Sequence, residues 1–211
     1  MVSVSLPTVP DGQVLRVGTV TSTQDVAREL PIGSIVIADH QTAGRGRMER
    51  RWDDEPATAL LVSFVLERSA LLSLAAGVAA ARACGDGVRL KWPNDLLVDG
   101  RKLGGILVET TPAKAICGIG INLGWAPEGA ARLDQSREAV FDRLRAEIEE
   151  WTHAGDERVL DEWRARSATL GRRVRVDVSG RIVEGTATGL GPRGELIVDG
   201  APIVAGSVTH L

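Results

Sequence analysis

The pattern of apolar residues changes near Gly171, and this change constrains the fold more than any other feature. Before residue 168, runs typical of strands alternate with segments of helical periodicity, whereas short alternating strands follow from Gly171 onward. This order predicts an α/β (α+β) chain with two domains. Residues 1–168 are expected to form a large domain of strands and helices, and residues 169–211 a small β-barrel.

The individual elements can be placed from periodicity and from turn residues. Strands are expected over 14–20, 34–39, 58–67, 88–92 and 115–123, and helices over 22–30, 69–84 and, as a pair, 136–168. The segment 96–110 contains two apolar runs around Asp99-Gly100, which predicts a hairpin. In the tail, strands are expected over 173–178, 182–190, 195–199 and 202–211.

Composition excludes several classes of protein. No apolar run reaches the ~18 residues of a transmembrane helix, and the N-terminus lacks the order of a signal peptide, so we expect a cytoplasmic protein without a membrane partner. Cys84 and Cys117 lie in apolar surroundings and are expected to be buried free thiols. A net charge of −3, no tyrosine and two phenylalanines argue against a nucleic-acid partner.

Several motifs of common enzymes are absent or misplaced. The chain has neither a phosphate-binding P-loop motif nor a serine nucleophile elbow, and its three histidines have no zinc spacing. The segment GLGPRG (189–194) matches a dinucleotide-binding pattern. Because Pro192 stands where that site needs the start of a helix, the segment is interpreted as a tight turn.

A loop dense in arginine follows the strand expected at 34–39. The segment HQTAGRGRMERRW (40–52) places Arg45, Arg47, Arg50 and Arg51 around two glycines. Glycines allow a close backbone approach to a ligand, and guanidinium groups bind phosphate or carboxylate with two hydrogen bonds. The loop therefore indicates an anion site, although a solvated surface loop would give the same pattern.

Two further segments use the few lysines of the chain. Of 25 basic residues only Lys91, Lys102 and Lys114 are lysine, so a lysine here suggests a chemical requirement. KWPND (91–95) contains the first beside Asp95, and RKLGGIL (101–107) contains the second before two glycines. Each segment alone could be a turn or a bulge. Together they favour an acyl-phosphate or nucleotidyl reaction, in which cations stabilise charge on phosphate oxygens.

The motifs as a set resemble those of biotin protein ligases in order and spacing. They are STQ (22–24), QTAGRGR (41–47), RRW (50–52), KWPND (91–95), RKLGGIL (101–107) and GIGINL (118–123). The resemblance is close over residues 14–125, and the tail is similar to the SH3-like C-terminal domain of the family. It implies a mixed-sheet catalytic domain in which biotin and ATP, with Mg²⁺, give biotinyl-5′-AMP and pyrophosphate. A lysine of a biotin carboxyl carrier domain, of acetyl-CoA or pyruvate carboxylase, then accepts the biotin.

Carried over residue by residue, the resemblance also implies a site. The catalytic set would be Lys102, Arg45, Arg47 and Asp95. Biotin would be held by Ser22, Thr23, Gln24, Gln41, Gly44, Arg45, Gly46, Arg47, Lys102 and Gly105. ATP would be held by Arg47, Arg50, Trp52, Lys91, Asn94, Lys102 and Asn122, with Mg²⁺ at Asp95. The Gly44–Arg47 segment is expected to close over biotin and the adenylate phosphate as a lid.

The chain also departs from the family pattern. Gln24 stands where the family has asparagine, and Ser207 stands where the tail often carries an acidic residue. About 13 residues precede the first expected strand, too few for the DNA-binding helix-turn-helix of some members, so we expect a ligase without a DNA-binding domain. We also expect a monomer or a weak homodimer. A lipoate-type ligase and a non-catalytic binder of biotin or biotinyl-adenylate remain as alternatives.

Overall fold

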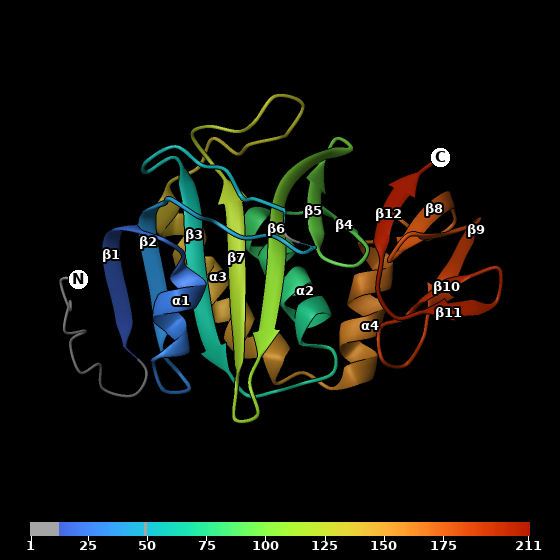
Figure 1. Ribbon diagram of the computed structural model, residues 1–211, viewed down its shortest axis with the longest axis horizontal. Helices are drawn as coiled ribbons and strands as arrows, with labels where there is room; N and C mark the ends of the chain where they lie inside the picture. The colour runs from blue at the N-terminus through green and yellow to red at the C-terminus, as the bar shows by residue number, and fades with distance from the viewer. Residues whose placement is uncertain (1–12, 49) are drawn as a thin grey trace.

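The computed structural model describes residues 13–48 and 50–211, and its largest element is a seven-stranded sheet (Figure 1). The strands are β1 (Val14–Val20), β2 (Ile35–Gln41), β3 (Ala59–Leu66), β4 (Arg89–Lys91), β5 (Asp95–Val98), β6 (Arg101–Thr110) and β7 (Ala115–Asn122). They follow the order β1-β2-β3-β7-β6-β5-β4 across the sheet. β1 pairs with β2 in parallel and the other pairs are antiparallel, so the expected mixed sheet is confirmed.

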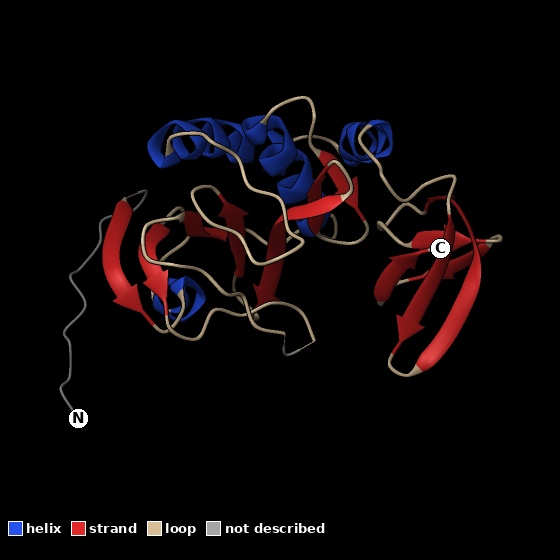
Figure 2. Ribbon diagram, turned by 90° about the horizontal axis from the view of Figure 1, so that it is seen from above, coloured by secondary structure: helices blue, strands red, loops and turns tan. Residues whose placement is uncertain are grey.

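Helices cover both faces of this sheet (Figure 2). α1 (Thr23–Arg28) packs on β2, β3 and β7, whereas α2 (Leu72–Cys84) and α3 (Arg137–Thr152) pack together on the opposite face. α4 (Asp156–Ala165) contacts α2 and the C-terminal strand over Arg181–Leu190. Within residues 13–48 and 50–211, no helix is both long and apolar enough to cross a membrane.

The two cysteines belong to the core between these layers. Cys84 ends α2 and Cys117 lies in β7, and both are buried and free. Burial raises the pKa of each thiol to about 12, because a thiolate would lose its hydration. The expected buried thiols are therefore confirmed, and neither is a reactive nucleophile at neutral pH.

The hairpin of β5 and β6 turns where the sequence predicted. Asp99 and Gly100 both have positive φ, 50° and 74°, the conformation that favours an Asp-Gly pair in a two-residue turn. The register shifts between Leu96 and Leu97, an irregularity of the β-bulge type. Beyond this shift Asp95 pairs with Gly105, and the hairpin carries Asp95 and Lys102 on neighbouring strands. The turn and the bulge thus place two predicted site residues side by side.

The C-terminal residues form a second, antiparallel sheet of five strands. These are β8 (Arg173–Val178), β9 (Arg181–Leu190), β10 (Leu196–Val198), β11 (Ala201–Ile203) and β12 (Ser207–His210), in the order β11-β10-β9-β8-β12. The expected single strand over 202–211 is wrong. The chain pairs first with β10 and then with β8, which are not neighbours, so it must leave one edge of the sheet and join the other.

The segment 189–194 contains the last two residues of β9 and then a turn, as its proline predicted. It connects β9 to β10, the amide of Gly194 donates to the carbonyl of Gly191 at 3.0 Å, and Gly194 has a φ of 81°. The two sheets meet close to this turn. The indole Nε1 of Trp92 donates to the carbonyl of Gly194 at 2.9 Å, and Thr169 Oγ1 accepts from the Trp92 amide at 3.0 Å. Trp92 is 2% exposed, so its indole is shielded from water. Its two hydrogen bonds hold the small sheet against the large one.

Replacing Trp92 with phenylalanine tests this junction. The variant leaves the buried Gly194 carbonyl without its donor, and an unsatisfied buried group costs about 1–3 kcal/mol. For a chain of this length that corresponds to a fall in Tm of roughly 2–10 °C. Differential scanning calorimetry measures the change, and an unaltered Tm would mean that the indole hydrogen bond does not contribute to the stability of the fold.

Candidate active site

A cavity of about 150 Å³ lies where the arginine loop (residues 44–52), the β4–β5 turn and β12 meet the α1 face of the large sheet. It collects most of the residues singled out from the sequence, although these come from segments far apart in the chain. The predicted residues that line it are Ser22, Thr23, Gln24, Gln41, Arg45, Gly46, Arg47, Arg50, Trp52, Lys91, Asn94, Asp95, Lys102 and Gly105. Gly44 and Asn122 do not line it.

One end of the cavity is a wall of neutral hydrogen-bonding groups. The side-chain oxygen of Gln41 accepts from the Thr23 amide at 2.7 Å and from the Thr23 hydroxyl at 3.1 Å. Ser63, which the sequence did not single out, donates to Thr23 Oγ1 at 2.8 Å. Ser22 caps α1 through its hydroxyl, which accepts from the Gln24 amide. All five side chains are buried, so this wall is rigid and uncharged.

Gln24 has unused hydrogen-bonding capacity at this wall. Its Nε2 donates to the carbonyl of Leu107 at 2.9 Å, while its buried Oε1 has no partner among the described residues. Buried polar atoms are nearly always paired, so an orphaned acceptor that lines a cavity is suited to a ligand donor. Gly118 makes room for this longer side chain, because a Cβ there would lie 2.8 Å from Gln24 Nε2.

The other end of the cavity is cationic. Lys102 Nζ lies 2.7 Å from Asp95 Oδ1, and Lys91 and Arg47 approach the same carboxylate. Burial lowers the pKa of Lys91 and of Arg47, and Asp95 opposes this effect in both. Asp95 is the single carboxylate among the described lining residues. Positive charge therefore exceeds negative charge at this end, which favours an anionic ligand.

The arginine loop folds back on itself as a short hairpin. The Gly46 amide donates to the Arg50 carbonyl at 2.7 Å, and the Trp52 amide donates to the Gly44 carbonyl at 3.0 Å. Gly44 does not line the cavity but is needed for the shape of the loop, since a Cβ there would lie 2.5 Å from the Trp52 carbonyl oxygen. These hydrogen bonds join the two arms of the loop, so its described residues hold fixed positions relative to one another.

The tip of the loop reaches the C-terminal sheet, which the sequence did not predict. Arg47 donates to Asn94 Oδ1 at 3.0 Å and to the Gly206 carbonyl at 3.3 Å, and Arg50 donates to Ser207 Oγ at 3.0 Å. Gly206, Ser207 and Val208 line the cavity. The C-terminal residues therefore form part of the cavity wall.

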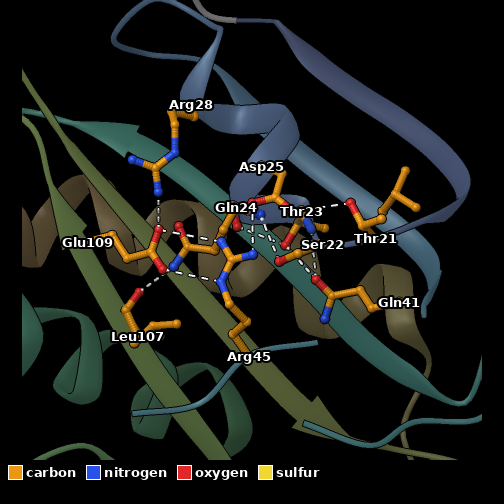
Figure 3. A network of polar contacts seen from close by, with 12 residues as sticks. Thr21, Ser22, Thr23, Gln24, Asp25, Arg28, Gln41, Arg45, Leu107 and Glu109 are labelled. Carbon is orange, nitrogen blue, oxygen red and sulfur yellow. Dashed lines mark hydrogen bonds and ion pairs between the residues drawn. The ribbon is translucent and has the colours of Figure 1, made fainter. Parts of the chain in front are cut away.

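Arg45 differs from Arg47 and Arg50, because ion pairs with two carboxylates occupy its guanidinium (Figure 3). Its Nη1 lies 2.8 Å from Asp25 Oδ1, and its Nε lies 3.3 Å from Glu109 Oε1. Burial lowers the pKa of Arg45, but hydrogen bonding to Asp25 and the charge of Glu109 outweigh it and raise the pKa overall. Because its guanidinium is already paired, Arg45 is less available to a ligand than its predicted catalytic role requires.

Asn122, expected to contact ATP, lies outside the cavity for a clear reason. Its side chain is 3% exposed, and its Nδ2 donates to the carbonyl of Ala131 at 3.0 Å. The amide therefore fixes the chain that follows β7, and it is not presented to a ligand.

No cluster of three or more histidine, cysteine, aspartate or glutamate side chains is suited to a metal ion in the part of the chain described. The cavity instead joins a neutral wall to a cationic end, beneath a loop that contacts both sheets. This arrangement can bind a molecule with a neutral polar group at one end and an anion at the other. It can also stabilise negative charge that develops on carboxylate or phosphate oxygens.

Known proteins are similar to both parts of this chain. Residues 12–125 match the model of the biotin/lipoate A/B protein ligase family, and residues 169–210 match the biotin protein ligase C terminal domain. The biotin–(acetyl-CoA-carboxylase) ligase of Mycobacterium tuberculosis is 36% identical, with 85% of this chain and 79% of that protein covered. The bifunctional ligase/repressor BirA of Escherichia coli is 32% identical, with 81% and 63% covered.

A solved structure agrees with these relatives. The biotin protein ligase of Aquifex aeolicus in complex with biotin and ATP superimposes with a TM-score of 0.79 at 25% identity, and the match covers 94% of this chain and 98% of that one. The large sheet and the C-terminal sheet therefore both belong to a known two-part arrangement.

Proposed function

The chain belongs to the biotin protein ligase family, and from this premise we propose that it activates biotin with ATP and transfers the biotinyl group to a lysine of a carrier domain. This is the reaction of an ATP-dependent biotin–(acetyl-CoA-carboxylase) ligase. We assign the substrates to residues 1–168 and a supporting role to residues 169–211, whose Gly206–Val208 segment lines the cavity.

The observation that carries the proposal is the change in polarity along one cavity. Thr23, Gln24 and Gln41 offer neutral hydrogen bonds to the ureido ring of biotin, and Gln24 Oε1 is a free acceptor for a ureido N–H. Val62, Ile106 and Ile119 also line the cavity and suit the apolar part of biotin. Its carboxylate then reaches the cationic end, where the phosphates of ATP are also stabilised.

In the first step, a carboxylate oxygen of biotin attacks the α-phosphorus of ATP. A bond forms between them, the bond to the pyrophosphate oxygen breaks, and pyrophosphate leaves. Both reactants are anions, so Lys102 and Arg47 reduce their repulsion and stabilise the charge on the phosphate oxygens in the transition state. Asp95, paired with Lys102 at 2.7 Å, orients that ammonium.

In the second step, the amine of the carrier lysine attacks the carbonyl carbon of the adenylate. The carbon–oxygen bond to phosphate breaks, AMP leaves, and the amine nitrogen loses one proton, which passes to solvent, as the amide forms. Lys102 again stabilises the leaving phosphate. Closure of the arginine loop keeps water away from the mixed anhydride, which would otherwise hydrolyse.

The residues present fit a Mg²⁺ ion that arrives with ATP. Mg²⁺ is usually held by one or two carboxylates together with substrate phosphates and water, and Asp95 provides one carboxylate at the cationic end. The bound ion would neutralise phosphate charge. Asn94 is less available, because its side chain already bonds Arg47 and the Ile106 carbonyl.

We infer further that acetyl-CoA or pyruvate carboxylase provides the carrier domain, that the protein is a monomer or weak homodimer, and that it has no nucleic-acid partner. The net charge is −3, and Arg45, Arg47, Arg50 and Arg51 line the cavity. We therefore assign these four arginines to the ligand and not to a nucleic-acid backbone.

One incubation tests the function. Purified protein is mixed with ATP and radiolabelled biotin or lipoate, with and without a biotin carboxyl carrier domain. A biotin ligase labels the carrier with biotin and releases AMP and pyrophosphate. Transfer of lipoate alone would identify a lipoate-type ligase, and binding of biotin without release of pyrophosphate would identify a non-catalytic binder.

The contact between Trp52 and Gly120 leads to a prediction about nucleotide binding. We place Trp52 beside the nucleotide, and a Cβ at Gly120 would lie 2.6 Å from its ring. Gly120→Ala must displace the indole, and such overpacking costs about 1–3 kcal/mol, so the KM for ATP should rise about tenfold. Gly18→Ala is the control, since nothing lies within 4 Å of its added Cβ. Equal KM values in the two variants would remove Trp52 from the ATP site.

A further inference from the structure

We propose that Asp25 and Glu109 are positioning residues that hold the arginine loop closed at the biotin end of the cavity, through Arg45. The proposal deepens the proposed function and rests on it for the identity of the ligand. Arg45, Asp25 and Glu109 form an inner clasp. Arg45 belongs to the arginine loop, Asp25 to α1 and Glu109 to β6, so the clasp connects the loop to the helix and to the strand beside the neutral wall (Figure 3).

Both carboxylates are held in place by a second partner. Thr21 Oγ1 donates to Asp25 Oδ2 at 3.1 Å, which leaves Oδ1 for Arg45. Arg28 Nη2 lies 2.5 Å from Glu109 Oε2, and Arg45 bonds both oxygens of the same carboxylate. The clasp is therefore preorganised, because neither acidic side chain needs to reorient to receive Arg45.

The clasp lies beside Gln24. Asp25 directly follows it in the chain, and Glu109 lies two residues beyond Leu107, whose carbonyl accepts from Gln24. The opposite end of the loop is fixed separately by Arg47 and Arg50, through Asn94, Gly206 and Ser207. Loss of the inner clasp should thus free the biotin end of the loop and leave the nucleotide end attached.

The exposure of the three side chains determines how much the inner clasp contributes to retention of biotin. The side chains of Arg45, Asp25 and Glu109 are 36%, 43% and 25% exposed, so water and salt screen their attraction. Because the clasp combines two carboxylates, we expect biotin to dissociate about three to ten times faster without it, and the difference to shrink at high salt.

The test uses Asp25→Asn and Glu109→Gln, which keep shape and remove charge. We expect the KM for biotin and its dissociation rate to rise three- to tenfold, while kcat at saturating biotin and the KM for ATP stay within about twofold. Glu138→Gln is the matched control, since it removes an exposed ion pair to Arg16 of similar geometry on another face. In the Arg45→Gln background, Asp25→Asn should have no further effect.

A second measurement separates this inference from the proposed function. Amide hydrogen exchange of residues 44–48 and 50–52 should speed up in both variants without any ligand, because the lid opens more often. Unchanged exchange, or additive effects of Asp25→Asn and Arg45→Gln, would overturn the clasp even if the wild type is an active ligase. A wild type that makes no adenylate overturns the proposed function, while exchange still decides the clasp.

Discussion

Replacing Lys102 with alanine is expected to slow formation of biotinyl-5′-AMP by more than about 100-fold, the effect of removing one charge-stabilising group from an active site. Lys102 Nζ lies at the cationic end of the cavity, 2.7 Å from Asp95 and 6.0 Å from the centre of the Trp52 ring. The substitution removes a cation and leaves the Asp95 carboxylate near the phosphates. Single-turnover pyrophosphate release at saturating biotin and ATP measures the effect.

Lys102→Arg should also be slow, because a planar guanidinium cannot take the place of a compact ammonium in this space. Gly105 adjoins the lysine, and even a Cβ added there would make only an ordinary contact with Nζ at 3.5 Å, so the shape of the charged group and not a lack of room limits the arginine variant. Lys114→Ala serves as the control lysine, since its ammonium donates to the Leu30 carbonyl outside the cavity. Normal turnover of Lys102→Ala with an unaltered melting curve would exclude Lys102 from the mechanism.

Local features of the fold could be predicted because their physical causes are local. The Asp99-Gly100 turn depends on two residues that tolerate positive φ, and the turn at 189–194 depends on proline and glycine. The division of 202–211 into β11 and β12 could not be predicted in this way. It depends on which strands lie at the two edges of the small sheet, and alternation alone does not reveal strand partners.

In the site too, residues that belong to short motifs could be predicted, whereas contacts between segments far apart in the chain could not. The segments that carry Thr23, Gln41 and Lys102 could be recognised from motifs, and the cavity contains all three. The motifs did not reveal that Glu109, 64 residues away in the chain, would pair with Arg45, or that Ser207 would meet Arg50. Such pairs depend on how the elements pack, which no short sequence pattern encodes.

Asn122 illustrates a limit of motif transfer. Its position within GIGINL suggested a ligand contact, but its amide is buried against Ala131. Some residues of a motif contact a ligand and others serve packing, and the sequence alone does not show which residue has which role. Gly44 is similar, because a side chain there would collide with the Trp52 carbonyl oxygen and would not reach into the cavity from its wall.

Replacing Arg47 with alanine is expected to release the adenylate about 10- to 100-fold faster, the range for loss of a charged hydrogen-bonding group of about 1.5–3 kcal/mol. Burial lowers the pKa of Arg47, so its charge acts in a poorly hydrated environment where its interaction with phosphate is strong. The substitution also frees the loop tip from Asn94 and Gly206. Escaped biotinyl-5′-AMP should then acylate lysines of unrelated proteins.

Two measurements check this expectation. The first follows the half-life of the enzyme–adenylate complex after rapid dilution, and the second follows biotin incorporated into serum albumin. Arg175→Ala is the control, because that arginine is 53% exposed, pairs with Glu184 in the C-terminal sheet and does not line the cavity. If Arg47→Ala retains the adenylate as long as Arg175→Ala does, Arg47 does not hold the intermediate. In that case retention of the adenylate would depend on Lys102 and the inner clasp.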